Sequence, residues 1–170
     1  MALLDYIEQA RQVTQRKKVS IWIDGACHPN PGFGSWGAVL RYGDREKHLS
    51  GIVPEDPTTS SRAELYAAIK ALGALREPCV VAVSSDSSYL VETMLGNYRR
   101  GANEDLWGLL DAVVAPHQVS WTWVRGHAGD RDNEVAHRLA ERVLRVKSAP
   151  EAERQGRWCE QLDVGRRATS

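Results

Sequence analysis

The chain has 170 residues, of which 42% are hydrophobic and 26% are charged, a balance typical of one globular domain with a buried core. Its 22 basic and 22 acidic residues cancel, so the overall charge does not indicate a nucleic-acid partner, and any such partner has to be bound by local groups. Three cysteines, at Cys27, Cys79 and Cys159, are too few and too far apart for a disulfide framework or a cysteine zinc site, which favours a reducing, cytoplasmic setting.

Residues 1–18 predict a short extension that precedes the main domain. Apolar residues between Leu3 and Val13 recur at the spacing of an amphipathic helix, which ends at the basic run 16–18. Asp5 and Glu8 interrupt the apolar stretch that a signal peptide requires, and no later segment is apolar over a length that could cross a membrane. We therefore expect no membrane partner.

The first part of the domain predicts three antiparallel strands. The run 19–24 is apolar and rich in β-branched residues, and it breaks at Gly25 and at the turn residues 29–32. Two further strands are expected over 36–42 and 45–53, because the polar dipeptide between them is typical of an antiparallel hairpin.

The rest of the chain alternates between helices and strands. Hydroxyl residues at 58–61 can cap a helix over 61–75, and the apolar run 79–85 is typical of a centrally buried strand. The further elements expected are helices over 87–95, 104–115 and 132–146 and a strand over 119–124. Together they predict an α/β fold: a five-stranded mixed sheet, three antiparallel strands and then parallel strands, flanked by helices. We expect one domain over 19–146 and a loosely held polar tail over 147–170.

Two tryptophans, Trp121 and Trp123, alternate along the last predicted strand. Their indoles could form a platform for base stacking. Val119 shares their face, however, and makes core packing the favoured interpretation.

Three carboxylates lie next to apolar sequence: Asp24 ends the first strand, Glu64 lies near the start of the first helix, and Asp86 ends the buried strand. If the first and fourth strands run parallel side by side, their carboxyl ends bring Asp24 and Asp86 together, and the helix can deliver Glu64 to the same place. Oxygen-only sites suit Mg²⁺ or Mn²⁺, and two such ions about 4 Å apart can promote hydrolysis of a phosphodiester. Taken singly, each carboxylate is better explained as a cap or as a first-turn residue stabilised by the helix dipole.

Several short strings occur together in the order and at the separations of a known family. They are Ile-Asp-Gly-Ala-Cys at 23–27, Asn-Pro-Gly at 30–32, Trp-Gly-Ala-Val-Leu at 36–40, Thr-Thr-Ser-Ser-Arg-Ala-Glu-Leu at 58–65, Ser-Asp-Ser at 85–87, Asp-Leu-Trp at 105–107 and Trp-Val-Arg-Gly-His-Ala-Gly at 123–129. Ordered motifs are far more specific than any one of them alone. Over residues 19–145 the chain resembles type 1 ribonuclease H, the bacterial ribonuclease HI family.

The resemblance implies a hydrolase, an endonuclease that cuts the RNA strand of RNA–DNA hybrids with two divalent ions, Mg²⁺ or Mn²⁺, and leaves 5′-phosphate and 3′-hydroxyl ends. It assigns the metals to the positions of Asp24, Glu64 and Asp86. It also assigns proton transfer or product release to His127 on a glycine-flanked loop, for which an ordinary exposed loop histidine is the alternative interpretation. We expect a cytoplasmic monomer that removes R-loops and RNA primers.

The resemblance further implies contacts to the minor groove of the hybrid, where only the RNA strand presents 2′-hydroxyl groups. The residues expected to make substrate contacts are Cys27, Asn30, Ser60, Ser61, Ser88 and Arg125. Ser60 and Ser61 stand where bacterial members usually have asparagines, and Ser88 where glutamine is usual, so their reach is shorter. Hydroxyl turns and caps are the alternative interpretation of these serines.

The largest departure lies in the last helix, where the family's fourth catalytic aspartate aligns with His137. Imidazole ligates Mn²⁺ readily and Mg²⁺ poorly, or it can orient a water molecule without ligating, so we expect a catalytic His137 with a shifted metal preference. Two alternatives remain open: Glu134, one turn earlier, supplies the missing carboxylate, or three carboxylates suffice and His137 is a neutral helix residue. Asp132 lies too near the helix start for this role.

A second departure is the basic handle, a tryptophan-rich helix and loop that grips the DNA strand in many bacterial members. Here only Tyr98, Arg99 and Arg100 occupy that region. Because phosphate contacts dominate affinity, we expect weak, salt-sensitive binding unless residues 16–18 or the arginines of the tail substitute. Two rival functions are another nuclease of the superfamily that acts on DNA, and a non-catalytic module that binds hybrids. The motif over 125–129 argues against the first, and only His137 favours the second.

Overall fold

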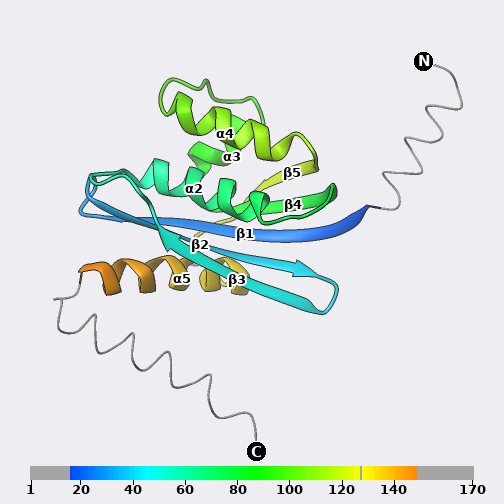
Figure 1. The fold of residues 1–170 in the computed structure, drawn as a ribbon, viewed down its shortest axis with the longest axis horizontal. Coiled ribbons are helices and arrows are strands. Elements are labelled where there is room, and N and C mark those ends of the chain that lie inside the picture. Colours follow the sequence, from blue (N-terminus) through cyan, green and yellow to red (C-terminus); the bar gives the residue numbers. More distant parts are fainter. Residues whose placement is uncertain (1–15, 127, 149–170) are drawn as a thin grey trace, which may run out of the picture.

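The computed structural model of the chain describes residues 16–126 and 128–148. These residues form a five-stranded mixed sheet in the order β3-β2-β1-β4-β5 (Figure 1). The strands are β1 (Lys17–His28), β2 (Phe33–Tyr42), β3 (Arg45–Ile52), β4 (Cys79–Ser85) and β5 (Gln118–Trp123). The predicted sheet is therefore confirmed, whereas the helix predicted between Leu3 and Val13 and the tail from residue 149 onward lie outside the described residues.

Helices cover both faces of the sheet. On one face lie α2 (Ser60–Gly73), α3 (Ser88–Met94) and α4 (Glu104–Val114), and on the other face α5 (Arg131–Ser148) packs against β1, β2 and β3 (Figure 1). Within the described part of the chain, no helix combines the length and the apolar character needed to cross a membrane.

Side chains cap the two helices that frame the site. The hydroxyl of Thr59 accepts a hydrogen bond of 3.3 Å from the amide of Arg62 at the start of α2, as the run of hydroxyl residues predicts. The carboxylate of Asp130 accepts bonds of 3.1 Å from the amides of Asp132 and Asn133 at the start of α5. Since α5 continues to Ser148, the first two residues of the predicted polar tail are helical.

The register of β1 positions the carboxylates. β1 pairs antiparallel with β2 and parallel with β4, and Trp22 of β1 lies opposite Ser84 of β4. Two residues further along each chain are Asp24, inside β1, and Asp86, which directly follows β4. The prediction that the first strand ends at Asp24 and breaks at Gly25 is wrong, because β1 stays paired with β2 as far as His28. The parallel pairing of the first and fourth strands, the condition for bringing Asp24 and Asp86 together, is thus present.

The core lies between the sheet and α2. Ile21 and Ile23 of β1 and Val81 and Val83 of β4 are at most 1% exposed and pack against the apolar side of α2. β4 differs from the prediction, because Ala82 on its other face is exposed. On that face α5 packs against β1, β2 and β3, so β4 is buried on one side although it lies inside the sheet.

The two tryptophans of β5 have different environments. Trp121 is partly buried against the core, as predicted, whereas 49% of Trp123 is exposed, so the core-packing interpretation is wrong for Trp123. Trp123 pairs with Ser85 at the last step of the β4–β5 ladder, beyond the main core. Its indole N–H donates a 3.0 Å hydrogen bond to the carbonyl oxygen of Asp86, and this bond helps to fix the end of β4.

Candidate active site

Three carboxylates converge at one end of the sheet. Asp24 belongs to β1, Glu64 to α2 and Asp86 directly follows β4, and one oxygen of each lies within 4.8 Å of the others. Asp24 and Glu64 are 4% and 8% exposed, and Asp86 is partly buried. The structure therefore brings together the three side chains whose convergence the strand ends predict.

Close packing of α2 on β1 brings Glu64 to Asp24. A Cβ atom added to Gly25 would lie 2.4 Å from the backbone nitrogen of Glu64 and 2.5 Å from the carbonyl carbon of Ala63. Because no side chain fits at that distance, glycine at this position sets the separation of helix and strand. Asp24 thus supplies one carboxylate, and Gly25 leaves the space that lets α2 bring the carboxylate of Glu64 beside it.

Burial and neighbouring negative charge oppose the charged forms of Asp24 and Glu64. Burial, followed by the nearby charge of Asp86, raises the pKa of Asp24 from 3.8 to about 6, although a hydrogen bond with His137 partly offsets this effect. Burial, followed by the charges of Asp24 and Asp86, raises the pKa of Glu64 well above its ordinary value of 4.5. The Oε2 atom of Glu64 is also buried without a hydrogen-bond partner among the described residues. Such a cluster is stabilised when a cation is bound.

The donor set suits a hard divalent cation. All three converging groups offer carboxylate oxygens, and the cleft beside them leaves room for water. Mg²⁺ and Mn²⁺ prefer oxygen ligands, and Mg²⁺ usually keeps several waters when it binds to a protein. Asp24, Glu64 and Asp86 therefore fit the kind of metal that the sequence predicts.

His137 contacts the cluster from α5. Side chains alternate along β1, so Asp24 shares with Trp22 the face that α5 covers. The Nδ1 atom of His137 lies 2.8 Å from Oδ2 of Asp24, and its Nε2 atom lies 3.4 Å from Oε1 of Glu141, one turn further along α5. Within the described residues the converging ligand group consists of the three carboxylates, and His137 is its neighbour.

The other acidic candidates of α5 have different partners. Glu134 lies 3.9 Å from Arg138, and Asp132 is buried with an oxygen 2.8 Å from Nη2 of Arg41. Neither belongs to the converging group. Asp132 instead ties the start of α5 to β2, which carries Arg41.

Two residues near the cluster were not singled out from the sequence. Asn133 is 2% exposed, and its Nδ2 atom lies 3.5 Å from Oδ2 of Asp86. Glu141 lines the cleft and faces His137. The spacing of four residues between His137 and Glu141 is a sequence signal for this contact, whereas the contact of Asn133 depends on how α5 crosses the sheet.

A cleft of about 780 Å³ opens at the carboxylates. Its wall includes Cys27, Ser60 and Ser61, three of the residues predicted to contact substrate. Asn30 is joined to this wall, because its Oδ1 atom accepts a 3.3 Å hydrogen bond from the amide of Ser60. The Sγ atom of Cys27 lies 3.4 Å from the carbonyl oxygen of Thr58, so the same wall links β1 to the segment before α2.

The remaining predicted residues are more distant from the cluster or outside the described part of the chain. Ser88 is exposed at the first position of α3, next to Ser87, which lines the cleft. Arg125 is exposed in the segment after β5. Neither Ser88 nor Arg125 is among the described residues that form the cleft wall. His127 lies outside the described residues.

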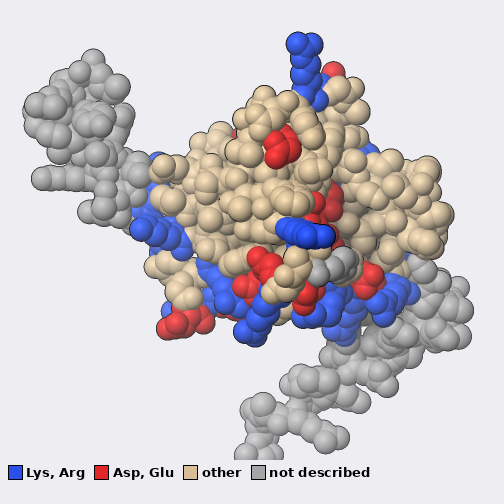
Figure 2. All heavy atoms as spheres, turned by 180° about the vertical axis from the view of Figure 1, so that it is seen from behind, with Lys and Arg blue, Asp and Glu red and all other residues tan. Residues whose placement is uncertain are grey.

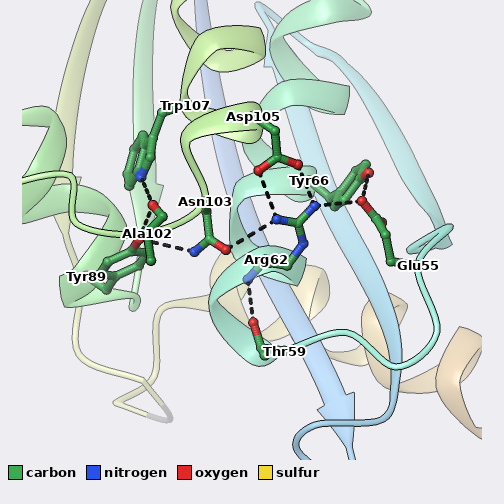
Figure 3. A network of polar contacts seen from close by, with 9 residues as sticks. All are labelled: Glu55, Thr59, Arg62, Tyr66, Tyr89, Ala102, Asn103, Asp105 and Trp107. Carbon is green, nitrogen blue, oxygen red and sulfur yellow. Dashed lines mark hydrogen bonds and ion pairs between the residues drawn. The ribbon is translucent and has the colours of Figure 1, made fainter.

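A polar network braces the start of α2 (Figure 3). The guanidinium of Arg62 donates to both oxygens of Asp105 at 3.0 and 2.7 Å, to Glu55 at 2.7 Å and to Asn103 at 3.3 Å. Hydrogen bonds with Asp105 and Glu55 raise the pKa of Arg62 further. Because Arg62 directly follows the two serines of the cleft wall, this network fixes their position relative to α4.

Sequence comparisons match the chain to one protein family. The profile of the RNase H family matches residues 16–145. Ribonuclease H of Halorhodospira halophila (strain DSM 244 / SL1) is 49% identical over 139 residues, which cover 74% of this chain and 92% of that protein. Ribonuclease H of Alkalilimnicola ehrlichii (strain ATCC BAA-1101 / DSM 17681 / MLHE-1) is 50% identical over 136 residues, which cover 72% of this chain and 92% of that protein.

Solved structures share the fold. RNase H1 from the halophilic archaeon Halobacterium salinarum NRC-1 superposes with a TM-score of 0.64 at 25% identity, over 75% of this chain and 97% of that one. LC9-RNase H1, a type 1 RNase H with the type 2 active-site motif, superposes with a TM-score of 0.63 at 27% identity, over 74% of this chain and 71% of that one. On the family match over residues 16–145 and on relatives that are about half identical, the chain belongs to the ribonuclease H family of hydrolytic endonucleases, as a type 1 member.

Proposed function

We propose that the chain cuts the RNA strand of RNA–DNA hybrids at the carboxylate cluster and leaves 5′-phosphate and 3′-hydroxyl ends. The observation that carries this proposal is the convergence of Asp24, Glu64 and Asp86 within 4.8 Å in an open cleft of a ribonuclease H fold. Two divalent ions per site, Mg²⁺ or Mn²⁺, are part of the proposal, because carboxylates in this arrangement suit paired hard cations.

The chain's own residues hold and orient the reacting groups in this proposal. Asp24, Glu64 and Asp86 would bind the ions through carboxylate oxygens. When bound, Mg²⁺ or Mn²⁺ supplies stabilisation for the negative charge that develops on the phosphate. With its proton on Nδ1, His137 donates a hydrogen bond to Asp24 and holds that carboxylate in one orientation.

Replacing His137 by aspartate is expected to tighten the binding of Mg²⁺. The variant adds a fourth carboxylate beside Asp24, and affinity for hard cations rises with the number of charged oxygen ligands. We expect the Mg²⁺ dissociation constant of the full chain to fall about tenfold, as measured by isothermal titration calorimetry without substrate. His137→Asn is the matched control, because it has the same shape as the aspartate and adds no charge. Equal affinities in the two variants would show that position 137 does not face the ions.

Substrate contacts are proposed for the cleft wall and for its surroundings. The residues are Cys27, Asn30, Ser60 and Ser61 within the wall or joined to it, and Ser88 and Arg125 outside it. The polar groups of the wall can meet the 2′-hydroxyls that distinguish an RNA strand from DNA. The two outer residues would contact the duplex further from the reacting phosphate. For His127 we propose assistance to proton transfer or product release.

The test of the function is cleavage of a labelled RNA–DNA hybrid beside duplex RNA and duplex DNA of the same sequence, each in Mg²⁺ and in Mn²⁺. We expect cutting of the RNA strand of the hybrid alone. Faster cutting in Mn²⁺ than in Mg²⁺ would indicate that the imidazole of His137 also ligates an ion, since Mn²⁺ accepts imidazole more readily. Mass spectrometry of the fragments identifies their ends. Cutting of duplex DNA would contradict the proposal, and binding of the hybrid without cutting in either ion would indicate a binding module.

The limits of the catalytic domain are proposed at residues 17 and 148. The domain predicted over 19–146 lacks the first two residues of β1 and the last two of α5.

We also propose that the catalytic domain acts as a monomer. Light scattering on the full chain after size-exclusion chromatography should give the monomer mass of 18.9 kDa. A mass of twice that value at every concentration would contradict a monomer.

A further inference from the structure

α5 carries a row of four arginines on one side. Arg131, Arg138, Arg142 and Arg145 are spaced by seven, four and three residues, so at about 100° per residue they fall within about 60° of one another around the helix. All four are exposed, and the side chains of Arg138 and Arg145 are 64% and 74% accessible. We refer to these four residues as the arginine stripe.

The arginine stripe flanks the cleft. His137, Glu141 and Leu144, on the adjacent side of α5, line the cleft, and Arg145 of the stripe lines it as well. The stripe extends about 20 Å along the helix, from its first turn to its last. In Figure 2, Lys and Arg side chains gather along the lower right edge, where α5 lies when Figure 1 is seen from behind.

The arginines of the stripe are available to an anion. Arg131 and Arg142 form no ion pair with another residue in the described part of the chain. Arg138 and Arg145 pair with glutamates of the same helix, at 3.9 and 2.7 Å, on the exposed surface. Pairs between exposed side chains contribute little to stability, so a phosphate can replace these partners.

Two cations in the regions where the sequence predicts attraction for the substrate are paired with acidic residues of the chain. Arg100, in the region of the missing basic handle, is bound by both carboxylate oxygens of Asp111 and lies 4.9 Å above the ring of Trp107. Lys17, in the predicted basic run near the start, pairs with Glu77. Because the whole chain has a formal charge of zero, attraction for a polyanion has to come from a local excess of cations such as the stripe.

We propose that the arginine stripe binds the phosphate backbone of the nucleic-acid duplex that occupies the cleft, and so supplies the attraction that the handle region lacks. The inference rests on the function proposed above. A row of guanidinium groups matches a repeating anion such as a polynucleotide strand, whereas a single free phosphate would require donors that converge on one point. One end of the row lies at the cleft, which suits a strand that leads into the carboxylate cluster.

The test compares two double variants of the full chain that remove equal charge. Arg138→Gln with Arg142→Gln removes two cations of the stripe, and glutamine has nearly the helix propensity of arginine. Arg45→Gln with Arg76→Gln removes two exposed cations at the opposite end of the sheet, next to the β2–β3 turn and before the start of β4. Binding of a fluorescein-labelled RNA–DNA hybrid is followed by fluorescence anisotropy in EDTA at several salt concentrations.

We expect the stripe variant to bind the hybrid at least about tenfold more weakly near 0.1 M salt, and the slope of log K against log salt to become shallower by about one to two. The control variant should keep the wild-type slope. Arg138→Lys with Arg142→Lys should also keep most of the slope, since it retains the charge, which separates electrostatic attraction from a structural role. Equal slopes for both glutamine variants and the wild type would overturn the proposed role of the arginine stripe and leave the proposed function standing. Failure of the wild-type chain to bind the hybrid would overturn the proposed function together with the stripe.

Discussion

Replacing Asp24 by asparagine is expected to slow hybrid cleavage by at least about 10³-fold, which corresponds to about 4 kcal/mol of lost transition-state stabilisation. Asp24 belongs to the converging group of carboxylates and also contacts His137. Asparagine keeps the shape of the side chain but removes the negative charge that binds a cation. The rate is measured with saturating Mg²⁺ and again with Mn²⁺. Asp44→Asn, the same change in the exposed turn between β2 and β3, is the control and should cleave at the wild-type rate.

Without metal, the Asp24→Asn protein is expected to be more stable than the wild type. The pKa of Asp24 is raised from 3.8 to about 6 in the folded chain, chiefly by burial, so its charged form opposes folding at neutral pH. Removing that charge should add on the order of 2 kcal/mol to the free energy of unfolding, or about 4–8 °C in melting temperature, in EDTA at pH 7. A lower melting temperature for Asp24→Asn than for the wild type would contradict the repulsion between the carboxylates.

The raised pKa of Asp24 also sets the direction in which the stability of the metal-free protein changes with pH. A carboxyl whose pKa is higher in the folded than in the unfolded chain binds more protons when folded, so its protonation favours folding. The contribution of Asp24 is fully present below about pH 4 and is lost as the pH rises through about 6. In EDTA, the gap in melting temperature between Asp24→Asn and the wild type should therefore narrow as the pH is lowered from 7 to 5.

The five strands and the three carboxylates were accessible from the sequence because local patterns mark them, and the carboxylate cluster then required one condition, the parallel pairing of the first and fourth strands. Alternation and turn residues mark the strands, and Asp24 and Asp86 each follow an apolar run, so parallel pairing of those runs is enough to bring the two together. The family resemblance then supplied the reaction and the fourth position, His137.

Contacts that depend on how helices cross the sheet were not accessible in the same way. The approach of His137 to Asp24 and of Asn133 to Asp86 depends on the placement of α5 over β1, which no repeating pattern encodes. Exposure of Ala82 and Trp123 depends on how far the helices extend over β4 and β5. For Ala82 and Trp123 the neighbouring sequence predicts burial, but the placement of distant helices leaves both side chains exposed.

Replacing Gly25 by alanine is expected to destabilise the fold by about 3 kcal/mol, because the added methyl group would meet backbone atoms that cannot rotate away. The nearest of these atoms are the nitrogen of Glu64, at 2.4 Å, and the carbonyl carbon of Ala63, at 2.5 Å. α2 must then move outward from β1 and carry Glu64 with it. A displacement of about 1 Å between catalytic groups can cost about 10²-fold in rate, so the folded fraction of the variant should cleave slowly as well.

Gly108→Ala separates this crowding from the general effect of a methyl group on a glycine. Gly108 lies in the interior of α4, is exposed, and has open space where the Cβ atom would be added, so alanine there should stabilise the protein by about 1 kcal/mol through helix propensity. Urea unfolding gives the free energy of unfolding of both variants on one scale, when the slope of that free energy against urea concentration is the same for both. Opposite signs for the two alanines would tie the stability loss to the contact between β1 and α2. A Gly25→Ala chain as stable as the wild type would mean that α2 can be displaced freely, and the position of Glu64 would then have to be held by the metal ions themselves.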